Sequence, residues 1–288
     1  RRLLRCFGPG TGPDDDRRGI MRAVLSNAYG IIDHFDVLTE ALDGVREAGL
    51  DVVFDGCDLS ERRMSVRIVA PTLPVLAPEF LANYRSPHNG GRGGWNLESG
   101  RAAAAGEGLG FAPGSEPVVF AGLVISNSET GGGAFTITPR IVVQVCKNGL
   151  TITRDALRSV HLGGRLEEGP IRWSGDTQRR ALALVRAKTR DAVQTFLDVR
   201  YVRDAIDRMS ERAARPITEP TRQVEVVTQR LGVPVERREA VLAAFIGGGM
   251  LTVGGIMQAI SAVAQDTTDP DEAARLEDLA VAALDVSV

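Results

Sequence analysis

Basic residues are concentrated in one part of this chain, and their spacing suggests contact with an anion. Residues 171–238 contain 15 Lys/Arg and 9 Asp/Glu, a net charge of +6, whereas residues 239–288 contain 1 and 8, a net charge of −7. Contact with nucleic-acid phosphates needs such local positive charge. The candidate nucleic-acid-binding residues are Arg179, Arg180, Arg186, Lys188, Arg190, Arg200 and Arg203.

The same segment has a second interpretation. Asp191, Asp198 and Asp204 lie among these basic residues. Opposite charges three or four positions apart on a helix form ion pairs worth about 0.2–0.5 kcal/mol each. The sequence therefore leaves open whether the arginines form a binding face or an ion-paired, solvated face.

A glycine-rich stretch, SPHNGGRGGW, supplies a second group of candidates. His88, Arg92 and Trp95 lie in it, and loops carry binding residues more often than core positions do. A single histidine and a generic GGRGG run do not specify a ligand, so an irregular insertion without function is the alternative.

Enzymatic chemistry has little support. Cys146 and His161 are the residues that could form a thiol–imidazole pair, since a nucleophilic cysteine needs a nearby base. Cys146, however, lies in an apolar run where cysteine usually fills space in a core. No phosphate-binding glycine motif, nucleophile elbow or metal-ligand spacing is present. We assign no catalytic residue, no metal site and no cofactor, and keep a cryptic enzyme as the third hypothesis.

The bulk composition limits the class of protein. The chain has 288 residues, 43% of them hydrophobic, which is enough for a full core. No apolar run approaches the ~20 residues that span a bilayer, so we expect no membrane association. Three cysteines without a CxxC pair favour a reducing compartment, and hence a cytoplasmic protein. The chain does not begin with Met, which allows a truncated N-terminus.

The elements that would position these residues are strands followed by helices. We expect a disordered or truncated segment over 1–26, then an α+β domain over 27–170 that begins with a helix from Asp33. Its strands are predicted at 50–54, 64–69, 118–126 and 134–146, with an irregular Gly/Pro-rich insertion at 70–116. Pro139 should lie at an edge or a bulge, and Asn148-Gly149 should form a hairpin turn to a return strand.

Helical periodicity dominates from 176 onward. One helix of about 35 residues should end near Arg215-Pro216, and shorter helices should cover 219–231, 236–246, 253–265 and 269–284. The predicted fold class is therefore α+β: an antiparallel β-sheet core with a flanking helix, followed by a helical C-terminal segment over 171–288 that is packed on the core or extends from it.

A family resemblance rests on the most distinctive part of the chain. The segment FAGLVISNSETGGGAFTITPRIVVQVCKNGL, followed by VHLGG, resembles the phage/plasmid-like protein family, also called domain of unknown function 932. The tail GGIMQAISAVAQDTTDPDEAARLEDLA is similar to the C-terminal helices of that family. The resemblance implies a protein of a mobile genetic element and supplies no catalytic residues.

Two functions from different classes follow. The first is a non-enzymatic protein that binds DNA, single-stranded DNA in particular, as an oligomer. The second is a protein-interaction or self-assembly module, without nucleic-acid binding, whose interface uses the long strands at 118–146 and the acidic C-terminal helices.

Overall fold

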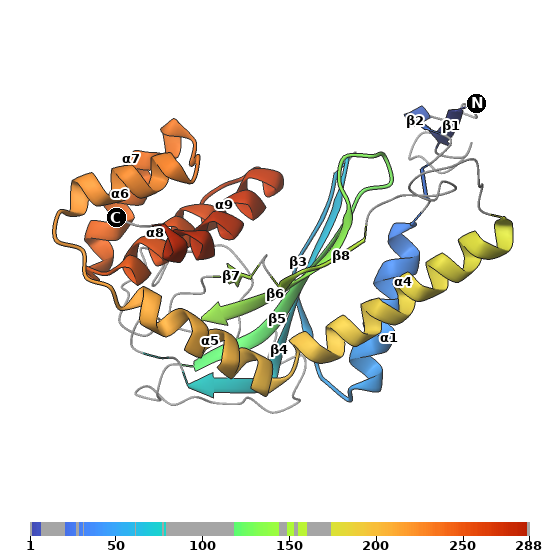
Figure 1. The fold of residues 1–288 in the computed structure, drawn as a ribbon, viewed down its shortest axis with the longest axis horizontal. Coiled ribbons are helices and arrows are strands. Elements are labelled where there is room, and N and C mark those ends of the chain that lie inside the picture. Colours follow the sequence, from blue (N-terminus) through green and yellow to red (C-terminus); the bar gives the residue numbers. More distant parts are fainter. Residues whose placement is uncertain are drawn as a thin grey trace.

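The fold was obtained as a computed structural model that describes residues 2–6, 21–26, 29–30, 32–60, 62–76, 78, 118–143, 149–152, 155–159 and 174–286. Within these residues an antiparallel sheet lies between two helical layers (Figure 1). The strands are β3 (Val53–Leu59), β4 (Met64–Leu76), β5 (Val118–Asn127), β6 (Phe135–Val143), β7 (Gly149–Thr151) and β8 (Leu157–Ser159). Their order is β3-β4-β5-β6-β7, and β8 pairs with β6 beside β7.

One face of the sheet forms the core because every second residue along the central strands β4, β5 and β6 is apolar and points to the same side. Val66, Ile68, Leu123, Ile125 and Ile137 are completely buried on this face. The predicted α+β class, with an antiparallel sheet and C-terminal helices, is therefore confirmed. The second face carries polar side chains over much of its area.

Two strand boundaries differ from the prediction. β4 continues to Leu76, through part of the expected irregular segment, because a register shift between Ala70 and Pro74 absorbs Pro71. β3 lies later than predicted because the turn to β4 is short. The Ser60 backbone N–H donates to the Arg63 carbonyl at 2.8 Å, and the Ser60 hydroxyl also accepts from the backbone of Arg63.

Pro139 lies where the outer side of β6 changes partner. It faces Leu123 of β5, and its carbonyl accepts from the backbone N–H of Ile152. The side of Pro139 that lacks an N–H therefore faces away from β5. It lies between the part of β6 that pairs with β7 and the part that pairs with β8. Pro139 thus lies in an interior strand and not at the expected edge or bulge. It is tolerated there because neither β7 nor β8 pairs with this position of β6. The return strand β7 is present, whereas the predicted turn at Asn148 lies outside the described residues.

Three helices cover the core face: α1 (His34–Glu47), α4 (Gly175–Phe196) and α5 (Val199–Ala213). The prediction of one helix over about 35 residues is wrong, because the chain breaks at Leu197. Asp198 then caps α5 by accepting from the backbone N–H of Arg200. The break lets α4 pack on β5, β6 and β8 while α5 packs on β4 and β5.

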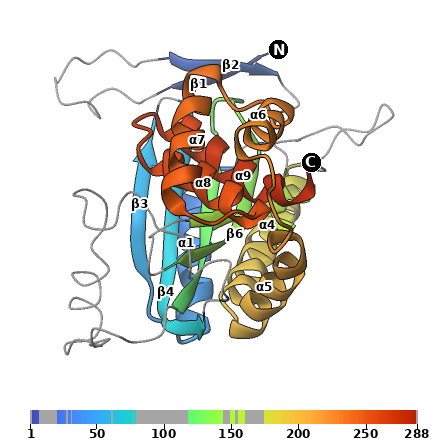
Figure 2. The same cartoon turned by 90° about the vertical axis from the view of Figure 1, so that its left-hand side faces the viewer.

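The remaining helices gather at one end of the molecule (Figure 2). They are α6 (Pro220–Arg230), α7 (Val235–Gly248), α8 (Val253–Gln265), α9 (Pro270–Ala282) and the short 3-10 helix η2 (Ala283–Asp285), and the four α-helices follow the predicted order. α8 is buried from Val253 to Ala264, which suits a helix that is apolar nearly all round. None of the helices in the described ranges is long and apolar enough to cross a membrane.

A buried ion-pair network joins this helical end to the second face of the sheet. Arg140 of β6 pairs with Asp55 of β3 and, at 3.1 Å, with Glu277 of α9. Thr151 of β7 donates to the same Glu277 carboxylate. Burial alone would lower the pKa of Arg140, but Glu277 and Asp55 outweigh it and raise that pKa further, so the guanidinium stays charged.

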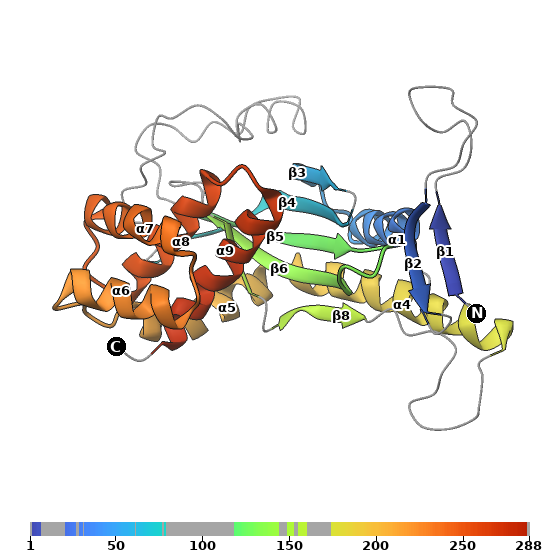
Figure 3. The ribbon, with the colours of Figure 1, turned by 90° about the horizontal axis from the view of Figure 1, so that it is seen from above.

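The N-terminal segment contains a hairpin at the opposite end of the molecule (Figure 3). β1 (Arg2–Cys6) pairs antiparallel with β2 (Met21–Ser26). The expectation of disorder over 1–26 is therefore wrong for these two stretches. The two strands are held in place because Arg5 and Arg22 bind carboxylates far along the chain. The composition of the segment does not reveal such contacts.

Candidate polar site at the sheet tip

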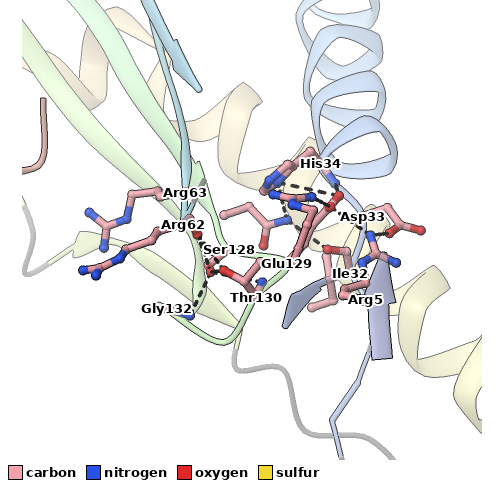
Figure 4. A network of polar contacts seen from close by, with 12 residues as sticks. Arg5, Ile32, Asp33, His34, Arg62, Arg63, Ser128, Glu129, Thr130 and Gly132 are labelled. Atoms are coloured by element: carbon pink, nitrogen blue, oxygen red, sulfur yellow. Dashed lines mark hydrogen bonds and ion pairs between the residues drawn. The ribbon is translucent and has the colours of Figure 1, made fainter. Parts of the chain in front are cut away.

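The most connected polar site lies at the tip of the sheet, where the β3–β4 and β5–β6 turns meet (Figure 4). The Ser128 hydroxyl donates to the Arg62 carbonyl at 2.6 Å and accepts from the backbone N–H of Gly132 at 2.9 Å. Gly131 has a φ of 82°, which favours glycine. A single serine thus fixes both turns relative to each other.

Glu129 is the centre of this site. Its carboxylate accepts from Arg5 at 2.9 Å, from Arg22 at 3.0 Å and from the backbone N–H of His34 at 2.8 Å. His34 begins α1, and Asp33 at the N-cap position makes no side-chain capping bond, since it pairs with Arg5. Glu129 therefore caps α1 from another element and ties the hairpin to the same point.

The electrostatics of the site favour fixed charges over proton transfer. Burial would raise the pKa of Glu129, but the backbone N–H of His34 and the Arg5 guanidinium outweigh it and hold that pKa below its ordinary value. Burial lowers the pKa of His34 despite the nearby Glu129. The His34 Nδ1 lies 2.9 Å from the Asn127 amide nitrogen, which also donates to the Ile32 carbonyl. Because the Asn127 amide nitrogen donates, His34 Nδ1 accepts and carries no proton. The His34 ring is therefore neutral.

No nucleophile–base pair results from this arrangement. Glu129 is ionised and bound by two arginines, while His34 is neutral and oriented by Asn127. The inner part of the site therefore positions structure: it fixes the hairpin, the start of α1 and the sheet tip relative to one another.

The outer side of the tip carries positive charge. The side chains of Arg62 and Arg63 project to the same side, away from Glu129 (Figure 4). Arg62 is exposed and forms no ion pair with another described residue. Among the same residues, Arg63 forms one ion pair, with Asp271 at 3.4 Å. The Cβ of an alanine at Gly133 would lie 3.4 Å from the Arg63 guanidinium, so this group lies over the glycine turn.

A row of polar side chains continues from the tip across the second face of the sheet. In register it runs from Ser65 to Ser126, Thr136 and Arg158, one residue on each of β4, β5, β6 and β8. Arg158 is exposed. On the other side of Ser65 stands Asp58, whose carboxylate is bound by Arg67 at 2.8 Å.

The candidate residues proposed from the sequence lie elsewhere, and most are neutralised. Arg179 and Arg180 are highly exposed and share the carboxylate of Asp176. Arg200 forms an ion pair with Asp198 at 2.6 Å.

Carboxylates of α1 neutralise the middle of α4. Arg186 pairs with Asp36 at 2.9 Å, and Arg190 pairs with Glu47 at 3.0 Å and with Glu40 at 3.4 Å. At the same contact, an alanine Cβ at Gly44 would lie 3.1 Å from the Cα of Arg190, so the two helices pack closely. These arginines therefore join α4 to α1. Lys188 and Arg203 are exposed, and among the described residues neither has an ion pair.

Several candidates cannot be placed. His88, Arg92, Trp95, Cys146 and His161 lie outside the described residues. The glycine-loop group and the cysteine–histidine pair therefore remain predictions.

Sequence reasoning also missed residues. Arg62, Arg63 and Glu129 are not among the candidate residues that the sequence suggests. The available signal was the combination of a Ser-Glu-Arg-Arg turn with a Ser-Glu-Thr-Gly-Gly-Gly turn, but only the strand register shows that the two turns meet.

Other sites within the described residues are weaker. No group of three or more His, Cys, Asp or Glu side chains there could hold a metal ion. A cavity of about 190 Å³ lies between α5, β7 and α9, and it is smaller than the roughly 300 Å³ at which ligand pockets begin. Its charged groups bind one another: Asp155 accepts from Arg208 at 2.7 Å and from the Tyr201 hydroxyl at 2.8 Å.

Comparisons with known proteins add no assignment. No protein-family model matches the chain, and the searches of curated proteins and of solved structures gave no match. The resemblance to the phage/plasmid-like family stays a prediction.

Proposed function

We propose that this protein is a non-enzymatic nucleic-acid-binding protein that contacts the backbone of single-stranded DNA at the sheet tip. The contacts are Arg62, Arg63 and Arg158. The observation that carries the proposal is the pair of arginines projecting together beside the glycine-rich turn (Figure 4). Among the described residues Arg62 has no ion pair, and Arg63 has one, with the exposed Asp271 at 3.4 Å.

Rigidity supports this location. The Arg62 backbone is held by the Ser128 and Thr130 hydroxyls at 2.6 and 3.3 Å, so little backbone entropy is lost when its side chain binds. Arginine also matches phosphate geometry with two parallel donors. Arg62 is therefore a better phosphate contact than arginines that would first have to leave an ion pair.

The row from Ser65 to Arg158 extends the contact. Neighbouring strands lie about 4.8 Å apart, so four strands span roughly 14 Å. Ser126 and Thr136 are partly exposed and offer hydroxyl groups between Arg63 and Arg158. The surface is a sheet face and not a projecting helix that could enter a major groove, which favours a single strand. The cytoplasmic location and the mobile-element origin expected from the sequence belong to the same proposal, and both suit DNA binding.

Fluorescence polarisation of a labelled oligothymidylate, measured over a salt series, tests the proposal. The variant R62A/R63A/R158A should bind more weakly than the parent protein. The slope of log K against log salt should fall by roughly 2, because each single-strand phosphate contact contributes about 0.7.

The control is R179A/R180A, which removes two arginines, 75% and 81% exposed, that are paired with Asp176. It should bind almost as the parent protein does. Two outcomes overturn the proposal: no binding by the folded parent protein at micromolar concentration, or an equal loss in the control. The second outcome would return the site to α4.

A further inference from the structure

We infer that copies of this chain associate head to tail, with the outer face of the β1–β2 hairpin of one copy on the exposed face of α7 of the next. The partner is a second copy, and the contact joins two different surfaces. The inference is independent of the proposed nucleic-acid binding.

The first surface is the outer face of the hairpin. Leu4, Met21 and Val24 are 57%, 58% and 53% exposed. The register pairs Leu4 with Val24 and Cys6 with Met21, so these side chains lie on one face, while Arg5 points towards Glu129 of the body. A two-stranded hairpin is marginally stable by itself, and here only its inner face is tied down. An apolar outer face on such a ribbon is a surface that a partner would stabilise.

The second surface is the exposed side of α7. Val235 and Ile246 are 69% and 61% exposed, and Leu251, just after the helix, is 56% exposed. Glu239 and Ala243 are also exposed and fall on the stripe between Val235 and Ile246, at positions three or four residues apart. The inner side of α7 packs on α6 and α8. The outer stripe is therefore apolar with acidic residues in and beside it.

Charge complementarity identifies a second copy as the partner. The two surfaces lie at opposite ends of the long axis (Figures 1 and 3). The hairpin end also carries the start of α4, where Arg179 and Arg180 are 75% and 81% exposed and share one acidic partner. The α7 end consists of α6 to η2, residues 220–285, which contain 5 basic and 10 acidic residues, a net charge of −5. The basic end of one copy, with its apolar patch, can therefore bind the acidic end of the next copy, which also has an apolar patch.

Of the self-assembly interface expected from the sequence, only the C-terminal helices take part in the contact proposed here. β5 is paired on both sides, with β4 and β6, and β6 is paired with β5 and with β7 and β8. The long strands at 118–143 therefore offer no open edge. Contact between two different surfaces at opposite ends produces rings or filaments, and not a symmetric dimer.

Complementary variants test the inference by analytical ultracentrifugation at about 100 µM protein, with a reductant because Cys6 and Cys57 are exposed. M21D/V24D blocks the hairpin face, and I246D/L251D blocks the α7 face. The parent protein should sediment as dimers and larger species, and each variant alone as a monomer. An equimolar mixture of the two should form a 1:1 dimer and nothing larger, because one intact surface remains on each.

The control is L76D, which changes a residue that is 62% exposed at the end of β4, away from both surfaces. It should assemble as the parent protein does, and circular dichroism should show all variants folded. A monomeric parent protein at this concentration overturns the inference. So does a mixture of variants that stays monomeric, since two different surfaces must complement each other.

Discussion

Replacing Glu277 with glutamine tests whether the helical end is held to the sheet by a buried charge. The Arg140, Glu277 and Asp55 side chains are 5%, 10% and 16% exposed. Glutamine keeps the size and one acceptor but removes the negative charge. Among the described residues, Arg140 would then keep only Asp55 as an ionised partner.

The magnitude follows from the cost of leaving a buried charge uncompensated. Breaking a buried ion pair by changing one partner costs about 3–5 kcal/mol. Asp55 remains, so we expect the lower end, about 3 kcal/mol. That corresponds to a factor of about 150 in the equilibrium between folded and unfolded protein.

Urea unfolding followed by circular dichroism measures this change, because the midpoint shifts with the free energy of unfolding. The matched control is Glu272→Gln, five residues earlier on α9. Glu272 binds Arg237 through two bonds of 2.9 and 3.0 Å, but both side chains are about one third exposed. Exposed ion pairs contribute little, so the control should lose only a small part of what Glu277→Gln loses. Equal losses in the two variants would refute the reasoning.

Three further predictions concern the tip and the helices. Stability should fall as the pH drops below about 6.5, where the unfolded chain protonates His34 more readily than the folded protein does. It should fall again below about 4.5, where the unfolded chain protonates Glu129 more readily than the folded protein does, and Glu129→Gln should make this second decrease smaller in a pH series of melting temperatures. Gly255→Ala should lower the free energy of unfolding by about 1–3 kcal/mol because its Cβ would overlap the Met250 carbonyl oxygen. Gly247→Ala, with nothing within 4 Å of the new Cβ, should be neutral or stabilising in the same urea assay. Asp269→Ala should cost about 1 kcal/mol, measured by thermal unfolding, because its carboxylate caps α9 by accepting from the backbone N–H groups of Asp271 and Glu272.

Local features of the sequence determined most of the elements. Apolar runs rich in β-branched residues set β5 and β6, and capping residues set the C-terminal helices. Gly249, for example, ends α7 in the left-handed conformation, and Asp269 begins α9. Such signals act within a few residues, so they can be read without the fold.

The tertiary structure decided which partner each charged residue binds. Arg190 is neutralised by Glu47, 143 positions away, and the start of α1 is capped by Glu129, 95 positions away. The arginines in the middle of α4 therefore join α4 to α1. The tip arginines Arg62 and Arg63 became the better candidates, because strand pairing brought two unremarkable turns together. Sequence patterns report local periodicity, whereas the partner of a charge depends on which distant segments the core places side by side.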